Sequence, residues 1–93
     1  MQVEDKDKIA RLANVIGKVI KKHRLEKNKT MYKISAECSI HKSSWRLIEQ
    51  GLVQDIKIST LWKISEGLDV PLITILKEVN AELGDKFSLT DLK

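Results

Sequence analysis

Apolar residues recur at helical spacing along the first part of this 93-residue chain. They are Ile9, Leu12, Ala13, Ile16 and Ile20, and steps of three and four residues place them on one face of an α-helix. Asn28 tolerates a left-handed backbone and indicates that this helix ends near Lys27. Only four glycines and one proline interrupt the chain, and 42% of its residues are hydrophobic. These features predict one small all-α domain with a real core.

Two short helices with a tight link between them are predicted in the middle of the chain. The first spans about residues 31–38, because Thr30 offers an N-cap oxygen, and Ile34 is its clearest core anchor. Ser39, Ile40 and His41 make a very short connection. The second helix spans about residues 42–50 and stops at Gly51. Trp45 and Ile48 are three residues apart and are expected to face inward.

The sequence pattern in the last third of the chain predicts two more helices and a tail. Ser59 is expected to cap a fourth helix whose apolar residues are Leu61, Ile64 and Leu68. Pro71 suits the first turn of a fifth helix, which Gly84 ends. Phe87, Leu89 and Leu92 of the tail could form one more turn capped by Ser88. The expected organisation is an N-terminal arm (1–8), a five-helix domain (9–80) and a C-terminal tail (81–93).

Charge is unevenly distributed along the chain. Lysine and arginine total 17 against 13 acidic residues, a net charge of +4. Residues 1–60 hold 13 basic and 7 acidic residues, whereas residues 61–93 hold 4 and 6. A basic segment of this kind is compatible with nucleic-acid binding and equally with an ordinary solvated helix face.

Several classes of function find no support in the sequence. The single cysteine, Cys38, sits at an apolar position and is expected to be a buried thiol, in keeping with a reduced, cytoplasmic setting. No grouping of cysteine and histidine matches a metal site, no nucleophile has a base beside it, and no glycine-rich phosphate loop is present. No apolar run approaches the length of a membrane span, and the charged N-terminus is unlike a signal peptide. We therefore expect neither an enzyme nor a cofactor or metal protein.

Residues 30–51 have the form of a helix-turn-helix unit, whose second helix enters the major groove of DNA. From about Leu12 to Lys77, the chain resembles the lambda-repressor and Cro type of helix-turn-helix domain, also called the XRE type. The resemblance is carried by residues 16–24, 30–51 and 58–70, and above all by the combined spacing of Arg24, Ile34, Ile40, Ile48, Glu49 and Gly51. It implies a compact five-helix DNA-binding domain, here with an extended first helix and a short tail.

The resemblance also implies roles for particular residues. Arg24 and Glu49 match a partly buried ion pair that ties the first helix to the third. Thr30 and the amide of Met31 match the start of the second helix, which usually meets a DNA phosphate. The positions that usually face or adjoin base edges are His41, Lys42, Ser43, Arg46 and Leu47, and Lys57 lies in a loop that often touches the DNA backbone. Lys42 and Arg46 have the chemistry to bind guanine or phosphate, and Leu47 can meet a thymine methyl.

The chain departs from the family pattern at several positions. Met31 stands where glutamine is common and can offer only its backbone N–H. Trp45 replaces an aliphatic residue, and we expect its ring edge to reach the surface. His23 replaces a leucine and is expected to be half-buried and bonded to a neighbour.

The function that follows is a sequence-specific DNA-binding transcriptional regulator, such as a repressor, acting as a homodimer on a palindromic operator. The alternative is a helix-turn-helix domain that binds a protein partner, as an antitoxin does, and has weak or no specific DNA binding, with Leu47 and Trp45 marking the contact patch. The apolar stripe at Ile9, Leu12 and Ala13 extends beyond the family pattern. This stripe is expected to be covered by the C-terminal tail, by a second copy of the chain or by a different partner.

Overall fold

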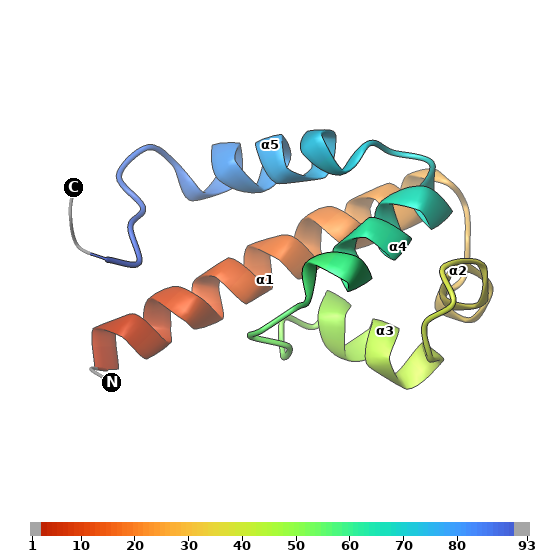
Figure 1. Ribbon diagram of the computed structural model, residues 1–93, viewed down its shortest axis with the longest axis horizontal. Helices are drawn as coiled ribbons and strands as arrows, with labels where there is room; N and C mark the ends of the chain where they lie inside the picture. The colour runs from red at the N-terminus through yellow and green to blue at the C-terminus, as the bar shows by residue number, and fades with distance from the viewer. Residues whose placement is uncertain (1–2, 91–93) are drawn as a thin grey trace.

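The computed structural model describes residues 3–90, with side chains described from residue 6 onward. Within that range the chain forms five α-helices and no strand (Figure 1). They are α1 (Val3–Glu26), α2 (Met31–Glu37), α3 (Lys42–Glu49), α4 (Ile58–Leu68) and α5 (Leu72–Leu83). None of these helices combines the length and the apolar character needed to cross a bilayer. The expectation of a five-helix, all-α chain is confirmed.

The start of α1 differs from the prediction, which placed an arm at residues 1–8. Residues 3–8 belong to the helix. The prediction followed the apolar stripe, which begins at Ile9. Backbone propensity carries the helix further, because no glycine or proline precedes Gly17.

Helix caps were predicted with mixed success. The Thr30 side chain accepts a hydrogen bond from the Lys33 amide at 3.1 Å, as an N-cap should. Ser59 is not a cap, because α4 begins one residue earlier and Lys57 occupies the N-cap position. Pro71 lies just before α5 rather than in its first turn, and Gly84 ends that helix as expected.

The tail contains no helix over residues 85–90, contrary to the extra turn that was expected. Half-buried Phe87 instead lies beneath the Arg11 guanidinium, 5.8 Å from its ring centroid. Arg11 also reaches the Leu83 carbonyl oxygen at 3.4 Å, so the segment after α5 lies beside α1. Leu92 lies outside the described residues.

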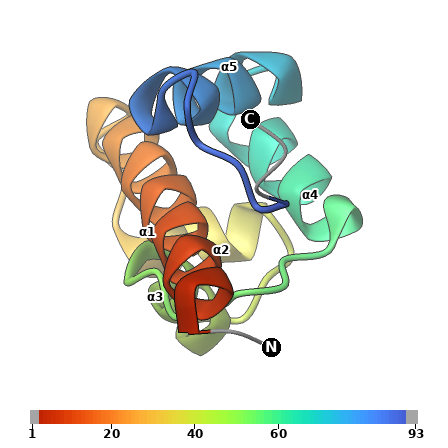
Figure 2. The same ribbon diagram turned by 90° about the vertical axis from the view of Figure 1, so that its left-hand side faces the viewer.

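Helix α1 is the centre of the arrangement, with α5 on one side and α3 on the other (Figures 1 and 2). All five helices contribute to one apolar core, formed by Val15, Val19, Ile20, Ile34, Cys38, Trp45, Ile48, Leu61, Ile64, Leu68, Ile75 and Val79. Ala13 is buried, and Leu12 and Ile16 pack against the core. Most of the apolar stripe of α1 is therefore covered within the chain.

Gly17 allows α1 to approach the end of α3 closely. A Cβ atom at this position would overlap the backbone carbonyl oxygen of Ile48 and crowd that of Glu49. Backbone atoms cannot move aside as a flexible side chain can. The distance between α1 and α3 thus depends on the absence of a side chain here.

Charged side chains join α1 to α5 at the surface. Glu78 accepts from the Lys22 ammonium, and His23 Nε2 lies 2.5 Å from Glu78 Oε1, so His23 is half-buried and bonded as expected. Lys18 Nζ lies 2.7 Å from Glu82 Oε1. The hydrogen bond from Lys22, followed by that from His23, holds the pKa of Glu78 below its usual value.

We expect Gly17→Ala to destabilise the protein by about 1–3 kcal/mol, because the new methyl group pushes α1 from α3. Urea unfolding followed by circular dichroism measures this. Lys21→Ala, at an exposed position of the same helix, should stay within about 0.5 kcal/mol of wild type. A Gly17→Ala variant as stable as wild type would contradict the close approach.

Glu78→Gln should lower stability at neutral pH, and the difference from wild type should vanish in acid. The folded state favours the Glu78 carboxylate, so its contribution is present above the unfolded pKa of about 4.3 and is lost as the pH falls through the lower, folded pKa. The free energies of unfolding of Glu78→Gln and wild type, measured from pH 7 to about pH 3, test this expectation. A difference that does not change with pH would contradict it.

Candidate functional site

The connection between α2 and α3 is short and closed by backbone hydrogen bonds. Ser39 adopts a left-handed backbone, with φ of 56°, and turns the chain. The Ile40 amide then donates to the Ser35 carbonyl oxygen at 2.9 Å. Ser35 itself is buried, and its hydroxyl donates to the Tyr32 carbonyl oxygen at 3.0 Å. The angle between the two helices is therefore set by local geometry.

Helix α3 has one buried face and one exposed face. Trp45 and Ile48 point into the core, as their spacing predicted. All the expected base-facing residues and their neighbour are exposed, namely His41, Lys42, Ser43, Arg46 and Leu47. Leu47 is 40% exposed, as several other large apolar side chains of the chain are. Four of these exposed side chains belong to α3 and one, His41, lies at its N-cap; the five are called the exposed strip below.

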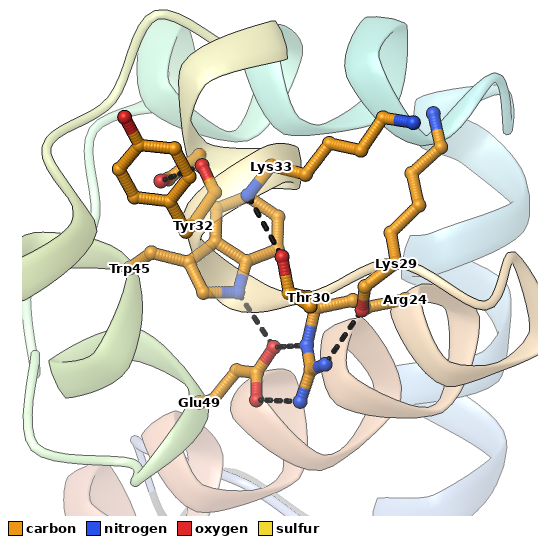
Figure 3. A network of polar contacts seen from close by, with 8 residues as sticks. Arg24, Lys29, Thr30, Tyr32, Lys33, Trp45 and Glu49 are labelled. Atoms are coloured by element: carbon orange, nitrogen blue, oxygen red, sulfur yellow. Dashed lines mark hydrogen bonds and ion pairs between the residues drawn. The ribbon is translucent and has the colours of Figure 1, made fainter.

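A buried network holds the end of α3 (Figure 3). Arg24 Nε donates to Glu49 Oε2 at 2.5 Å, and its NH2 group donates to Oε1 at 3.0 Å. The third guanidinium nitrogen donates to the Lys29 carbonyl oxygen at 2.8 Å. Arg24 therefore joins α1, α3 and the segment that leads into α2. A two-pronged arginine–carboxylate pair resists rotation better than a single contact does.

Trp45 belongs to this network, and the expectation of an exposed ring edge was wrong. Its side chain is 0% exposed, and Nε1 donates to Glu49 Oε2 at 2.6 Å. A buried indole N–H needs an acceptor, and Glu49 is one helical turn further along. The four-residue spacing of Trp45 and Glu49 was a signal in the sequence that could have revealed this bond. Trp45 cannot form part of a surface contact patch.

The remaining expected site residues lie apart from α3. Thr30 is exposed and Met31 is half-buried at the start of α2, where Met31 also packs against the core. Lys57 is exposed just before α4. Tyr32 and Lys33 are exposed in the same first turn of α2, and Tyr32 is 72% exposed. Sequence reasoning did not select these two, although their position beside Met31 places them at the same helix end.

The described side chains give little support for a metal site or for a cysteine nucleophile. They contain no group of three or more histidine, cysteine or acidic residues that could hold a metal ion. Cys38 is buried, and this burial raises the pKa of its thiol to about 11. A thiol protonated at neutral pH is a poor nucleophile.

Replacing Trp45 should reveal how much α3 depends on this network. We expect Trp45→Ala to cost about 3–5 kcal/mol, because it opens a cavity and removes a donor. Trp45→Phe retains most of the volume but leaves Glu49 one donor short, at a cost of about 1–3 kcal/mol. Tyr32→Phe, at an aromatic side chain that is 72% exposed, is the matched control and should change stability by less than about 0.5 kcal/mol. Urea unfolding distinguishes these cases, and a Trp45→Phe variant of wild-type stability would contradict the role of the bond.

Comparisons with known proteins identify no family for this chain. No protein-family model matches the chain, and no curated protein matches it either. A functional assignment therefore depends on the residues themselves: an exposed strip on α3, held from behind by Arg24, Glu49 and Trp45.

Proposed function

We propose that this protein is a sequence-specific DNA-binding transcriptional regulator that acts as a homodimer, with α3 in the major groove. The observation that carries the proposal is the exposed strip of His41, Lys42, Ser43, Arg46 and Leu47 on a helix whose other face is locked to the core. An α-helix with its side chains is about 10–12 Å across, which fits the ~12 Å width of the major groove. The resemblance to the lambda-repressor and Cro type supports the same assignment.

Each side chain of the strip has a role that its chemistry allows. Lys42 and Arg46 donate to guanine O6 and N7 or to phosphate oxygens, and Ser43 donates or accepts. Leu47 has no polar group, and its exposed side chain makes an apolar contact with a thymine methyl. His41 lies at the N-cap of α3, and its side chain accepts no capping hydrogen bond, which leaves its ring available to the DNA.

The sequence-independent part of the affinity comes from contacts to the DNA backbone. Thr30 and the Met31 amide are the expected phosphate contacts at the start of α2, and Lys57 is the expected contact before α4. The side chain of Met31 packs against the core, so that residue contributes only its backbone. The excess of basic residues in the first 60 positions favours approach to DNA over long range.

The competing proposal, a helix-turn-helix domain that binds a protein partner, has lost part of its support. It relied on a patch of Leu47 and Trp45, and Trp45 is fully buried. Leu47 alone is too small a patch to define a partner site. DNA readout accounts for Leu47 together with its basic neighbours.

Titration of a fluorescent random-sequence duplex at several salt concentrations tests the proposal. Wild-type affinity should fall steeply between ~50 and ~200 mM salt, because DNA binding releases counterions. Lys57→Ala removes an expected phosphate contact and should weaken binding and reduce the salt slope by about one unit. Lys42→Ala and Arg46→Ala should each weaken binding too, with helicity unchanged, because each removes a positive charge from the surface that faces the DNA. Lys77→Ala, an exposed lysine on α5, is the matched control. Wild-type affinity in both strip variants would show that α3 is not the DNA-binding surface.

A further inference from the structure

An apolar groove lies between α4 and α5, and none of the expected DNA contacts lines it. Its volume is about 660 Å³, and Trp62 and Ile73 in its walls are 57% and 62% exposed. Walls this open do not enclose a small molecule, which a ligand pocket usually buries by about 70% or more. The groove therefore suits an elongated segment laid along it. Its apolar lining residues are Trp62, Val70, Pro71, Leu72, Ile73 and Leu76.

The two walls of the groove differ in chemistry. The α5 wall is apolar, with Ile73 and Leu76 exposed on it. The α4 wall combines an aromatic side chain with two carboxylates: Trp62 and Glu66 are one helical turn apart, and Asp69 follows at the C-cap. A tryptophan face and a carboxylate are the two groups that attract a lysine or arginine side chain, through a cation–π contact and an ion pair.

The two carboxylates of the α4 wall lack a positive partner. No basic side chain lines the groove. Among the described residues, neither Glu66 nor Asp69 forms an ion pair or a side-chain hydrogen bond. By contrast, Glu37, Glu78 and Glu82 each pair with a lysine. The groove is therefore a local site of uncompensated negative charge on a basic protein.

The end of α4 adds to this negative charge. Glu66 lies in the last turn of α4 and Asp69 caps it, and that turn contains no basic residue. The C-terminal end of a helix carries partial negative charge, so acidic side chains there are unfavourable and a cation is favourable. A positively charged group in the groove would meet the carboxylates and the helix end together.

These observations select among possible occupants. A second copy paired through the same face would add two more carboxylates and no lysine from the groove lining, and like charges across an interface repel. DNA would be repelled in the same way. A wholly apolar segment would cover Glu66 and Asp69 without giving them a partner, which is costly. A segment with apolar and basic side chains satisfies both walls.

We propose that the α4–α5 groove binds a basic amphipathic helix of a partner protein. Its apolar side chains would lie against Ile73 and Leu76, and a lysine or arginine would lie over Trp62, between Glu66 and Asp69. A helix presents apolar and basic side chains on adjacent faces, as the two walls require. This inference goes beyond DNA binding and does not depend on it, because the groove and the expected DNA contacts share no residue.

Titration of a fluorescent peptide with the full chain, without DNA, tests the proposal. The probe is a designed peptide of about 18 residues, five helical turns, made of leucine on one face and lysine on the other. One control peptide has glutamate in place of lysine, and another has serine in place of leucine. Fluorescence anisotropy should show binding of the leucine–lysine peptide, with both controls at least about tenfold weaker. Tryptophan emission of the protein should move to shorter wavelength as Trp62 is covered, because the peptide contains no tryptophan.

Variants of the protein locate the binding surface. Glu66→Gln combined with Asp69→Asn should weaken peptide binding at least about tenfold, and asparagine tolerates the left-handed backbone of residue 69. Ile73→Ala should weaken binding through the other wall, and it serves if the double variant fails to fold. Asp55→Asn and Leu25→Ala, at exposed positions outside the groove, are the matched controls and should bind like wild type.

Four results would overturn the proposal. They are no binding of the leucine–lysine peptide, equal binding of the glutamate peptide, wild-type affinity in both groove variants, and a dimer of the free chain that Ile73→Ala abolishes. The last result would assign the groove to a second copy of the chain. None of these results bears on DNA binding by α3, which the duplex titration measures separately.

Discussion

Glu49 places a carboxylate with a side chain only 5% exposed at the end of α3, and its partners determine where that helix lies. Removing such a charge from water is costly unless strong donors surround it, and Arg24 and Trp45 supply them. Arg24 also holds the Lys29 carbonyl oxygen, so one guanidinium joins α1, α3 and the entry to α2. If either donor were absent, a buried charge would be left poorly compensated.

The exposed strip of α3 depends on this anchoring. An isolated helix of eight residues is unstable in water, so α3 exists through its packing. Trp45 and Ile48 fill the core beneath it, the Glu49 network holds its end, and Gly17 lets α1 approach the same end. Because one face of α3 is packed against the core, the side chains of its opposite face are held in a defined geometry. Such preorganisation is what recognition of base edges requires.

Sequence patterns predicted most of the fold, and the errors have physical causes. Periodic apolar residues located all five helices, whereas the start of α1 was missed because helix propensity extends beyond the apolar stripe. The Arg24–Glu49 pair followed from the family resemblance and is present in the structure. The full burial of Trp45 was missed because the space for its ring depends on how five helices pack, and its bond to Glu49 supplies the polar partner that allows burial. The groove beside Trp62 also escaped prediction, since it exists only once α4 and α5 are placed together.

Selection of bound fragments from a pool of randomised duplex DNA, at about physiological salt, tests the central claim most directly. The account predicts an enriched palindrome whose half-sites lie about one helical turn, ~34–36 Å, apart, since two copies of α3 must reach the same side of the duplex. No enriched sequence, from protein shown by circular dichroism to be folded, would contradict the assignment of α3 as a DNA-reading helix.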